Sequence, residues 1–221
     1  MIRPSRLLFL NVLLFLSSNT GLKAQSVLVK GSAKRITLNR EIKVVSGEIH
    51  AIKGIRDLVI KFDYTSKRVC SFPNDQAFVD HIKRSYSEKK GRALIDEWNT
   101  LPRKQLENKF TEIFNKNAAD IGLFAQADST HPLPFLLIRI LHEDPHFHTG
   151  VDGMPPNITL ECTFFDKEGE FLLRYTLTSY GSKQKVLMKR FEECYEIAGK
   201  MLARDLTMRM LKYDEQNFKK D

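Results

Sequence analysis

The chain has 221 residues, of which 42% are hydrophobic and 28% are charged, and its formal net charge at pH 7 is +8. It contains no internal repeat and no low-complexity segment, which makes a globular fold the expectation. The basic excess is small and scattered along the chain, so it excludes a dedicated nucleic-acid-binding protein, while weak attraction to an anionic membrane surface stays open.

Residues 1–24 have the order of a secretory signal peptide: a basic start with Arg3 and Arg6, an apolar run over residues 7–16, and a small polar segment. The run is too short to span a bilayer as a helix, which takes about 20 residues. We expect cleavage near Ala24 and export to the periplasm or cell envelope, with no transmembrane segment in the mature chain. Cleavage subtracts three of the 35 Lys and Arg residues and none of the 27 acids, so the net charge falls from +8 to +5.

The first half of the mature chain changes from strand to helix periodicity. Short alternating runs broken by glycines predict a β-rich segment over 25–56. Alternating apolar residues over 57–64 predict the clearest strand of this half. Helical spacing follows, and we expect a helix capped by Asn74 and stopped by Gly91, then a short helical piece over 92–98 and a helix beginning at Pro102.

The second half predicts strands followed by one long helix. A short apolar run over 121–127 precedes a dense strand at 134–143. Two strands within 156–180 are joined by a hairpin loop at 166–169, and an amphipathic helix covers 185–211. This order predicts a single α+β domain over 25–212, a mainly antiparallel sheet with helices packed on one face, and a polar tail over 213–221.

The three cysteines leave at least one thiol unpaired. Cys162 alternates with apolar residues of a predicted strand, and Cys194 lies on the apolar face of the long predicted helix. Both positions favour buried free thiols. A disulfide between Cys162 and Cys194 stays open, because it depends on whether that helix packs on that strand.

A histidine-rich stretch, "LHEDPHFHTGVDGMPP" at residues 141–156, is the first candidate for chemistry. If the strand before it continues, His142, Asp144, His146 and His148 share one face. His146 and His148 then lie about 6.6 Å apart between Cα atoms, close enough for both imidazoles to bind one zinc ion.

The oxygen ligand of such a site would be Asp144, Glu143 or Asp152. His142 lies about 13 Å from His146 at strand spacing, too far to contribute unless the chain bends at Pro145. The competing interpretation is an exposed strand end that enters a Gly- and Pro-rich loop. His146, His148 and Asp144 are therefore the candidate metal ligands, and no other cofactor is indicated.

Five segments follow one another between Asp57 and Leu211: "KFDYTSKRV", "FPNDQAFVDHI", Trp98 followed by "RKQLENKFTEIFNK", "FLLIRILHEDPHFHTGV" and "FEECYEIAGKMLARDL". In this order they resemble an uncharacterised family of signal-peptide-bearing exported proteins of Bacteroidetes-type bacteria. The resemblance implies no catalytic residues. It places His146 where the family has Gly and His148 where it has Asn, which argues against a shared metal site and favours a shaped turn from Asp144 to Gly150.

No G-x-S-x-G, G-x-x-x-x-G-K-[ST] or C-x-x-C motif occurs. The letters H-E-x-x-H do occur at residues 142–146, but they lie at the end of a predicted strand and include Pro145, whereas the zinc motif of this form needs a helix to place both histidines on one face. We therefore expect a non-catalytic binding or accessory protein of the cell envelope, whose partner is an unknown envelope protein or a small ligand. One alternative is a metal-assisted hydrolase that uses the 142–148 histidine cluster. Another is a small-ligand or lipid carrier in which Phe110, Phe114 and Phe191 line a void between sheet and helices.

Overall fold

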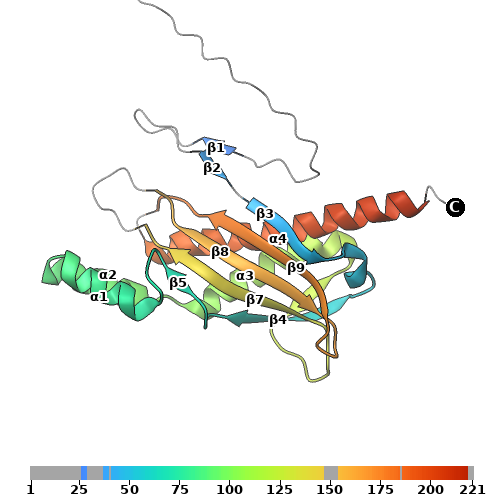
Figure 1. The fold of residues 1–221 in the computed structure, drawn as a ribbon, viewed down its shortest axis with the longest axis horizontal. Helices are drawn as coiled ribbons and strands as arrows, with labels where there is room; N and C mark the ends of the chain where they lie inside the picture. The colour runs from blue at the N-terminus through green and yellow to red at the C-terminus, as the bar shows by residue number, and fades with distance from the viewer. Residues whose placement is uncertain (1–25, 29–36, 40, 147–153, 185, 219–221) are drawn as a thin grey trace, which may run out of the picture.

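The computed structural model describes residues 26–28, 37–39, 41–146, 154–184 and 186–218 (Figure 1). Its main sheet contains β3 (Glu41–Gly47), β4 (Asp57–Asp63), β5 (Arg68–Val69), β6 (Phe124–Gln126), β7 (Phe135–Asp144), β8 (Asn157–Phe165) and β9 (Phe171–Tyr180). The helices are α1 (Asp75–Ser85), α2 (Glu88–Asn99), α3 (Arg103–Ala118) and α4 (Leu187–Phe218), with short 3-10 helices η1 (Ile49–Ile52) and η2 (Ala119–Ile121). β1 (Ser26–Leu28) and β2 (Thr37–Asn39) pair antiparallel with each other.

The seven-stranded sheet has the order β3-β9-β8-β7-β4-β6, and β5 pairs with β7 beyond the end of β4. The neighbours β3, β9, β8 and β7 are antiparallel. β4 is parallel to both β7 and β6, since α1, α2 and α3 intervene in the chain before β6 and β7. The sheet is therefore mixed and mostly antiparallel, which confirms the predicted α+β class.

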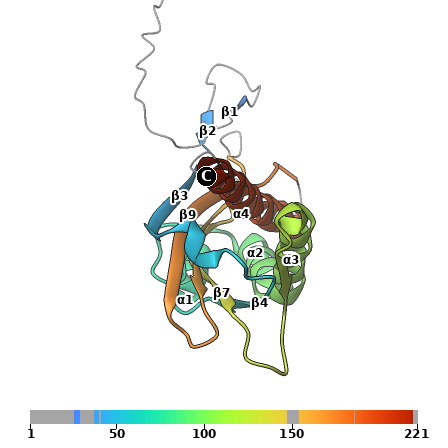
Figure 2. The ribbon, with the colours of Figure 1, turned by 90° about the vertical axis from the view of Figure 1, so that its right-hand side faces the viewer.

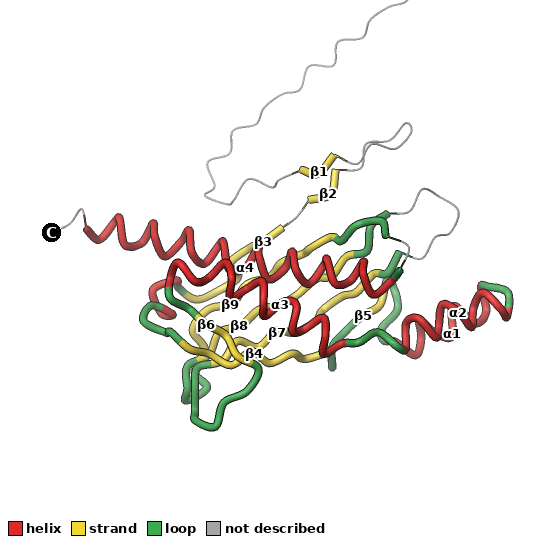
Figure 3. The backbone as a smooth tube through the Cα atoms, turned by 180° about the vertical axis from the view of Figure 1, so that it is seen from behind, coloured by secondary structure: helices red, strands yellow, loops and turns green. Residues whose placement is uncertain are grey.

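α3 and α4 lie side by side on one face of this sheet (Figures 2 and 3). Their backbones approach closely at Gly199, where a Cβ atom would lie 2.6 Å from the carbonyl oxygen of Phe110. Alternate residues of β7, β8 and β9 are fully buried beneath the two helices, because successive side chains of a strand point to opposite faces. Cys162 on β8 and Cys194 on α4 belong to this core, and both thiols are free.

The other face of the sheet carries no helix among the described residues and displays a row of ion pairs instead. Arg139 on β7 bonds Asp63 on β4 at 3.2 Å and Glu161 on β8 at 2.9 Å. Arg174 on β9 approaches the second oxygen of Glu161 at 3.8 Å. Opposite charges on adjacent strands support the strand register while leaving this face polar.

Several predicted boundaries differ from the structure. The first helix ends at Ser85 rather than at Gly91, and Gly91 is a buried residue inside α2. Asn74 does cap α1, accepting a hydrogen bond from the amide of Ala77 at 2.9 Å. The final helix continues through Phe218, so it includes most of the segment expected as a polar tail. Local periodicity cannot place these ends, since packing against other segments decides them.

Candidate functional site

The histidine stretch does not continue as a regular strand. The register between β7 and β8 shifts between Ile140 and His142, which leaves Leu141 as an extra residue. Because this bulge inverts the alternation, Glu143 continues the buried row of Ile140 and His142 does not. His142 therefore leaves the row of buried residues that its spacing from Ile138 and Ile140 would continue. His142 instead bonds the carbonyl of Cys70 through Nε2 at 3.0 Å.

Asp144 and His146 remain close together after the bulge. Nε2 of His146 lies 3.4 Å from Oδ2 of Asp144, and the amide of His146 donates to Oδ1 at 2.9 Å. His146 adopts a left-handed φ of 42°, so the strand has ended and the assumed strand spacing to residue 148 does not apply. His148 lies outside the described residues. Within them, no group of three or more His, Cys, Asp or Glu side chains is arranged to hold a metal ion.

Cys70 faces the same carboxylate. Its thiol donates a hydrogen bond to Oδ1 of Asp144 at 3.3 Å. Burial, and then the negative charge of Asp144, raise the pKa of the Cys70 thiol well above its ordinary value. A nucleophilic cysteine needs the opposite environment, one that stabilises the thiolate. This arrangement keeps the sulfur protonated and counts against a catalytic cysteine.

Glu143 lies at the centre of a buried charge cluster that sequence reasoning missed. Its side chain is fully buried, and Oε1 bonds Arg103 at the start of α3. Tyr195 of α4 donates to the same oxygen at 3.3 Å. Nζ of Lys67 lies 3.1 Å from Oε2 and forms an ion pair with it. Oε2 accepts no hydrogen bond from the described residues.

Lys67 connects this cluster to the first two helices. Its ammonium donates to Oδ1 of Asp75 at 2.8 Å, and the indole N–H of Trp98 donates to the same oxygen at 2.9 Å. The cations of Lys67 and Arg103 lie 5.1 and 5.2 Å from the Trp98 ring centroid, within cation–π range. Four charges and an indole therefore tie α1, α2 and α3 to the end of β7.

The buried charge cluster is suited to structure rather than to proton transfer. Glu143 has a cation at each oxygen, and burial followed by the charge of Glu143 raises the pKa of Tyr195 well above its ordinary value. A general acid or base needs a pKa near the working pH. The sequence pointed to Glu143 only as a candidate oxygen ligand of the histidine stretch, and its two oxygens are instead paired with Lys67 and Arg103.

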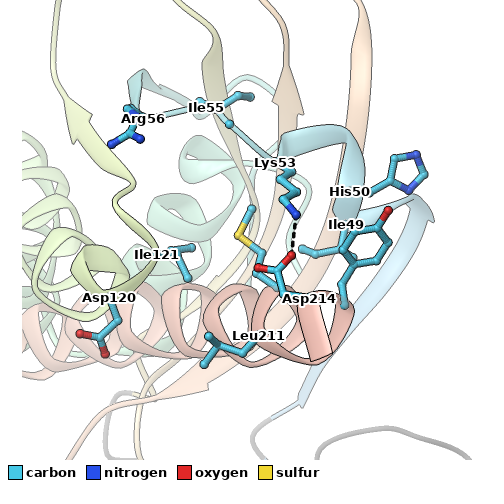
Figure 4. A pocket seen from close by; sticks show the side chains of 12 residues that line it. Ile49, His50, Lys53, Ile55, Arg56, Asp120, Ile121, Leu211 and Asp214 are labelled. Carbon is cyan, nitrogen blue, oxygen red and sulfur yellow. Dashed lines mark hydrogen bonds and ion pairs between the residues drawn. The ribbon is translucent and has the colours of Figure 1, made fainter. Parts of the chain in front are cut away.

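A pocket of about 320 Å³ lies at the opposite end of the sheet, between η1, the segment that follows it, η2 and the last turns of α4 (Figure 4). The apolar part of its lining comes from Ile49, Ile55, Ile121, Met210 and Leu211. The charged part comes from His50, Lys53, Arg56, Asp120 and Asp214. An apolar surface with a few charged groups around it is the usual composition of a ligand-binding pocket.

Two contacts hold α4 against η1 at this pocket. Lys53 donates to Asp214, and this hydrogen bond raises the pKa of Lys53 above its ordinary value (Figure 4). The rings of His50 and Tyr213 stack with centroids 5.9 Å apart. Arg56 and Asp120 make no side-chain hydrogen bond or ion pair with any described residue, so both charges are available to a ligand.

The rings proposed to line a carrier cavity are instead packed in the core. Phe110, Phe114 and Phe191 are fully buried. Phe110 stacks on Phe114 with centroids 6.3 Å apart, and Phe191 meets Trp98 edge-on at 6.0 Å. Aromatic rings at these distances fill the space between sheet and helices. The carrier interpretation therefore loses the residues on which it was based.

Comparison with solved structures finds distant similarity to PelC dodecamers. No family model and no curated protein matches the chain, so membership of the uncharacterised exported family is not confirmed. A variant PelC dodecamer from Paraburkholderia phytofirmans superposes with a TM-score of 0.38 and 14% identity, over 75% of this chain and 98% of that chain. A second PelC dodecamer from the same organism gives 0.37 and 14%, over 73% and 96%. Among the described residues, no helix combines the length and apolar character that would span a bilayer.

Proposed function

We propose that this protein is a non-catalytic binding or accessory protein of the cell envelope, and that it binds an amphipathic ligand in the pocket between η1 and α4. The ligand class follows from the lining, which offers an apolar surface and the guanidinium of Arg56, a cation without a side-chain partner among the described residues. A molecule or peptide segment with an apolar body and an anionic group satisfies both. This placement of Arg56 in a partly apolar pocket is the single observation that carries the proposal.

The state of the buried titratable groups supports binding over catalysis. Glu143 is held by Lys67 and Arg103, and the Cys70 thiol is held protonated beside Asp144. Export is proposed from residues 1–24, whose charge and apolar pattern is that of a signal peptide. We retain a single domain beginning at residue 25 as the proposal, and its last helix extends beyond the expected boundary at 212 to Phe218.

The probe for this proposal is 8-anilinonaphthalene-1-sulfonate, which combines an apolar ring system with an anionic sulfonate. We expect its fluorescence to rise with saturation on the wild-type protein. Leu211→Glu places a carboxylate in the pocket and should weaken binding at least tenfold, a difference of about 1.4 kcal/mol. Arg56→Ala should also weaken it, through the lost charge.

Met208→Glu is the matched control, because Met208 and Leu211 lie on the same helix with exposed fractions of 45% and 53%, and only Leu211 lines the pocket. Residues 1–24 are identical in all these proteins and contribute equally to the signal. Equal dye binding by the Leu211→Glu and Met208→Glu variants would contradict the proposed pocket.

Metal-assisted hydrolysis is the second candidate function. The observation in its favour is the pair of donor groups formed by Asp144 and His146, 3.4 Å apart. His148 would add a third ligand, and zinc would then polarise a bound water or substrate oxygen. The test is thermal unfolding with and without zinc. Zinc should raise the melting temperature of the wild type and not that of the His146→Ala, His148→Ala double variant, and an unchanged wild-type melting temperature would eliminate this candidate.

A further inference from the structure

α1 and α2 project together from one end of the sheet, and their connection forms the free end of the projection (Figure 3). Residues 81–92 at this end contain five basic side chains and one acid, Glu88. We call the five basic residues the basic tip, and all five are exposed: Lys83, Arg84, Lys89, Lys90 and Arg92. These cations are close together in the sequence, and the fold places them at the free end of the projection, away from the acidic residues at its base (Figure 3).

Two lysines lie in the first turn of α2, beside its one acid there. Glu88 begins the helix, Lys89 and Lys90 follow it, and Asp96 and Glu97 lie near its end, where no basic residue lies. A helix N-terminus carries partial positive charge and favours acids, whereas the C-terminus favours cations. Interaction with the helix dipole therefore does not account for Lys89 and Lys90.

Little of this charge is neutralised within the protein. Arg92 pairs with Glu88 at 2.6 Å, and Lys83 reaches Asp80 only at 3.9 Å. Neither Lys89 nor Lys90 has a carboxylate partner in the described part of the chain. Lys90 lies 4.9 Å from the ring centroid of the half-buried Tyr86, which places an aromatic ring among the cations.

The base of the projection is rigidly attached, so the tip has a defined direction. Trp98 near the end of α2 packs on Phe78 of α1 at 5.1 Å and on Phe191 of α4 at 6.0 Å. Asp75 at the start of α1 binds both Trp98 and Lys67. The buried charge cluster thus orients the helical pair.

We propose that the basic tip docks on the surface of an anionic phospholipid membrane. Clusters of four to eight Lys and Arg residues are attracted to anionic headgroups, and aromatic rings such as that of Tyr86 favour the interfacial region. The free end of a helical pair can bring several cations onto a plane of headgroups at once. This interaction is separate from the ligand pocket, which lies at the other end of the sheet.

The test is co-sedimentation of the full chain with vesicles of phosphatidylcholine alone and of an equal mixture of phosphatidylcholine and phosphatidylglycerol. The tip variant is Lys83→Ala, Lys89→Ala, Lys90→Ala. The control variant is Lys116→Ala, Lys183→Ala, Lys200→Ala, which removes the same charge from exposed lysines on the body. Residues 1–24 are the same in all three proteins, and circular dichroism checks that each remains folded.

The wild type should bind the anionic vesicles in preference to the neutral ones, and added salt should weaken that binding. The tip variant should bind roughly a hundredfold more weakly, and the control variant should lose far less. Equal loss in both variants would mean that net charge alone is responsible, and the proposal would be wrong. It would also be wrong if the tip variant lost binding to heparin but kept its binding to vesicles, because the partner would then be a polyanionic chain.

Discussion

The ammonium of Lys67 lies 3.1 Å from the carboxylate of Glu143, and their side chains are 5% and 0% exposed. Lys67 precedes α1, and Glu143 lies near the end of β7, so this pair joins two segments that are far apart in the chain. Arg103 supplies the second cation, from the start of α3. Such a pair must stay intact, since removing one member leaves the other charge buried without compensation.

Glu143→Gln should lower the free energy of unfolding by about 3 kcal/mol, because Lys67 then keeps a buried charge, and Arg103 a partly buried one, without their carboxylate. Urea denaturation followed by circular dichroism measures this change. Glu112→Gln is the control, since Glu112 is 64% exposed in its pair with Lys109. It should cost less than about 1 kcal/mol. A loss as small as this in Glu143→Gln would contradict a structural role for the cluster.

The two helical glycines should respond oppositely to alanine. In Gly199→Ala the new Cβ would lie 2.6 Å from the carbonyl oxygen of Phe110, so α3 and α4 must separate, at a cost of about 1–3 kcal/mol. In Gly91→Ala the closest atom is 3.6 Å away, an ordinary contact, and the better helix propensity should stabilise by up to about 1 kcal/mol. Thermal melts of both variants check these expectations, and a stabilised Gly199→Ala variant would contradict the close approach of α3 and α4 at Gly199.

Asp63 belongs to the ion pairs on the face of the sheet that carries no helix among the described residues. We expect it to make the free energy of unfolding depend on pH in the acid range. The hydroxyl and amide of Thr65, and then Arg139, lower the pKa of Asp63 below its ordinary value of 3.8. Because the folded state favours the ionised form, this stabilisation is present above pH 3.8 and is lost as pH falls through the folded pKa. Asp63→Asn should therefore be less stable than wild type at neutral pH and equal to it in strong acid. A stability difference that does not change with pH would contradict this assignment.

All three thiols should be free and slow to react in the folded protein. Cys162 and Cys194 are fully buried, and burial raises the pKa of each above its ordinary value. Alkylation followed by mass measurement should add three labels to the unfolded chain without a reductant. In the folded chain Cys70, which is half-buried, should react first. Two thiols resistant to labelling after unfolding would indicate a Cys162–Cys194 disulfide instead.

The candidate site shows where sequence reasoning stopped. The dense apolar run at 134–143 was correctly predicted as a strand, and Leu136, Ile138 and Ile140 face the core. The burial of Glu143 was not predicted, because the bulge at Leu141 is visible only in the pairing with β8. The pocket between η1 and α4 gave no local signal, since its lining comes from segments on either side of the first three helices and from the end of the chain.

The sequence by itself determined which stretches are strands and helices, the α+β class and the apolar faces that build the core. Those properties depend on propensity and periodicity within a few residues. Only the tertiary structure decided that Lys67 and Arg103 meet Glu143, that Arg56 and Leu211 line one pocket, and that the basic residues between 83 and 92 lie at the free end of a projection. Each of these placements depends on strand register or on the packing of helices against the sheet, which no local pattern encodes.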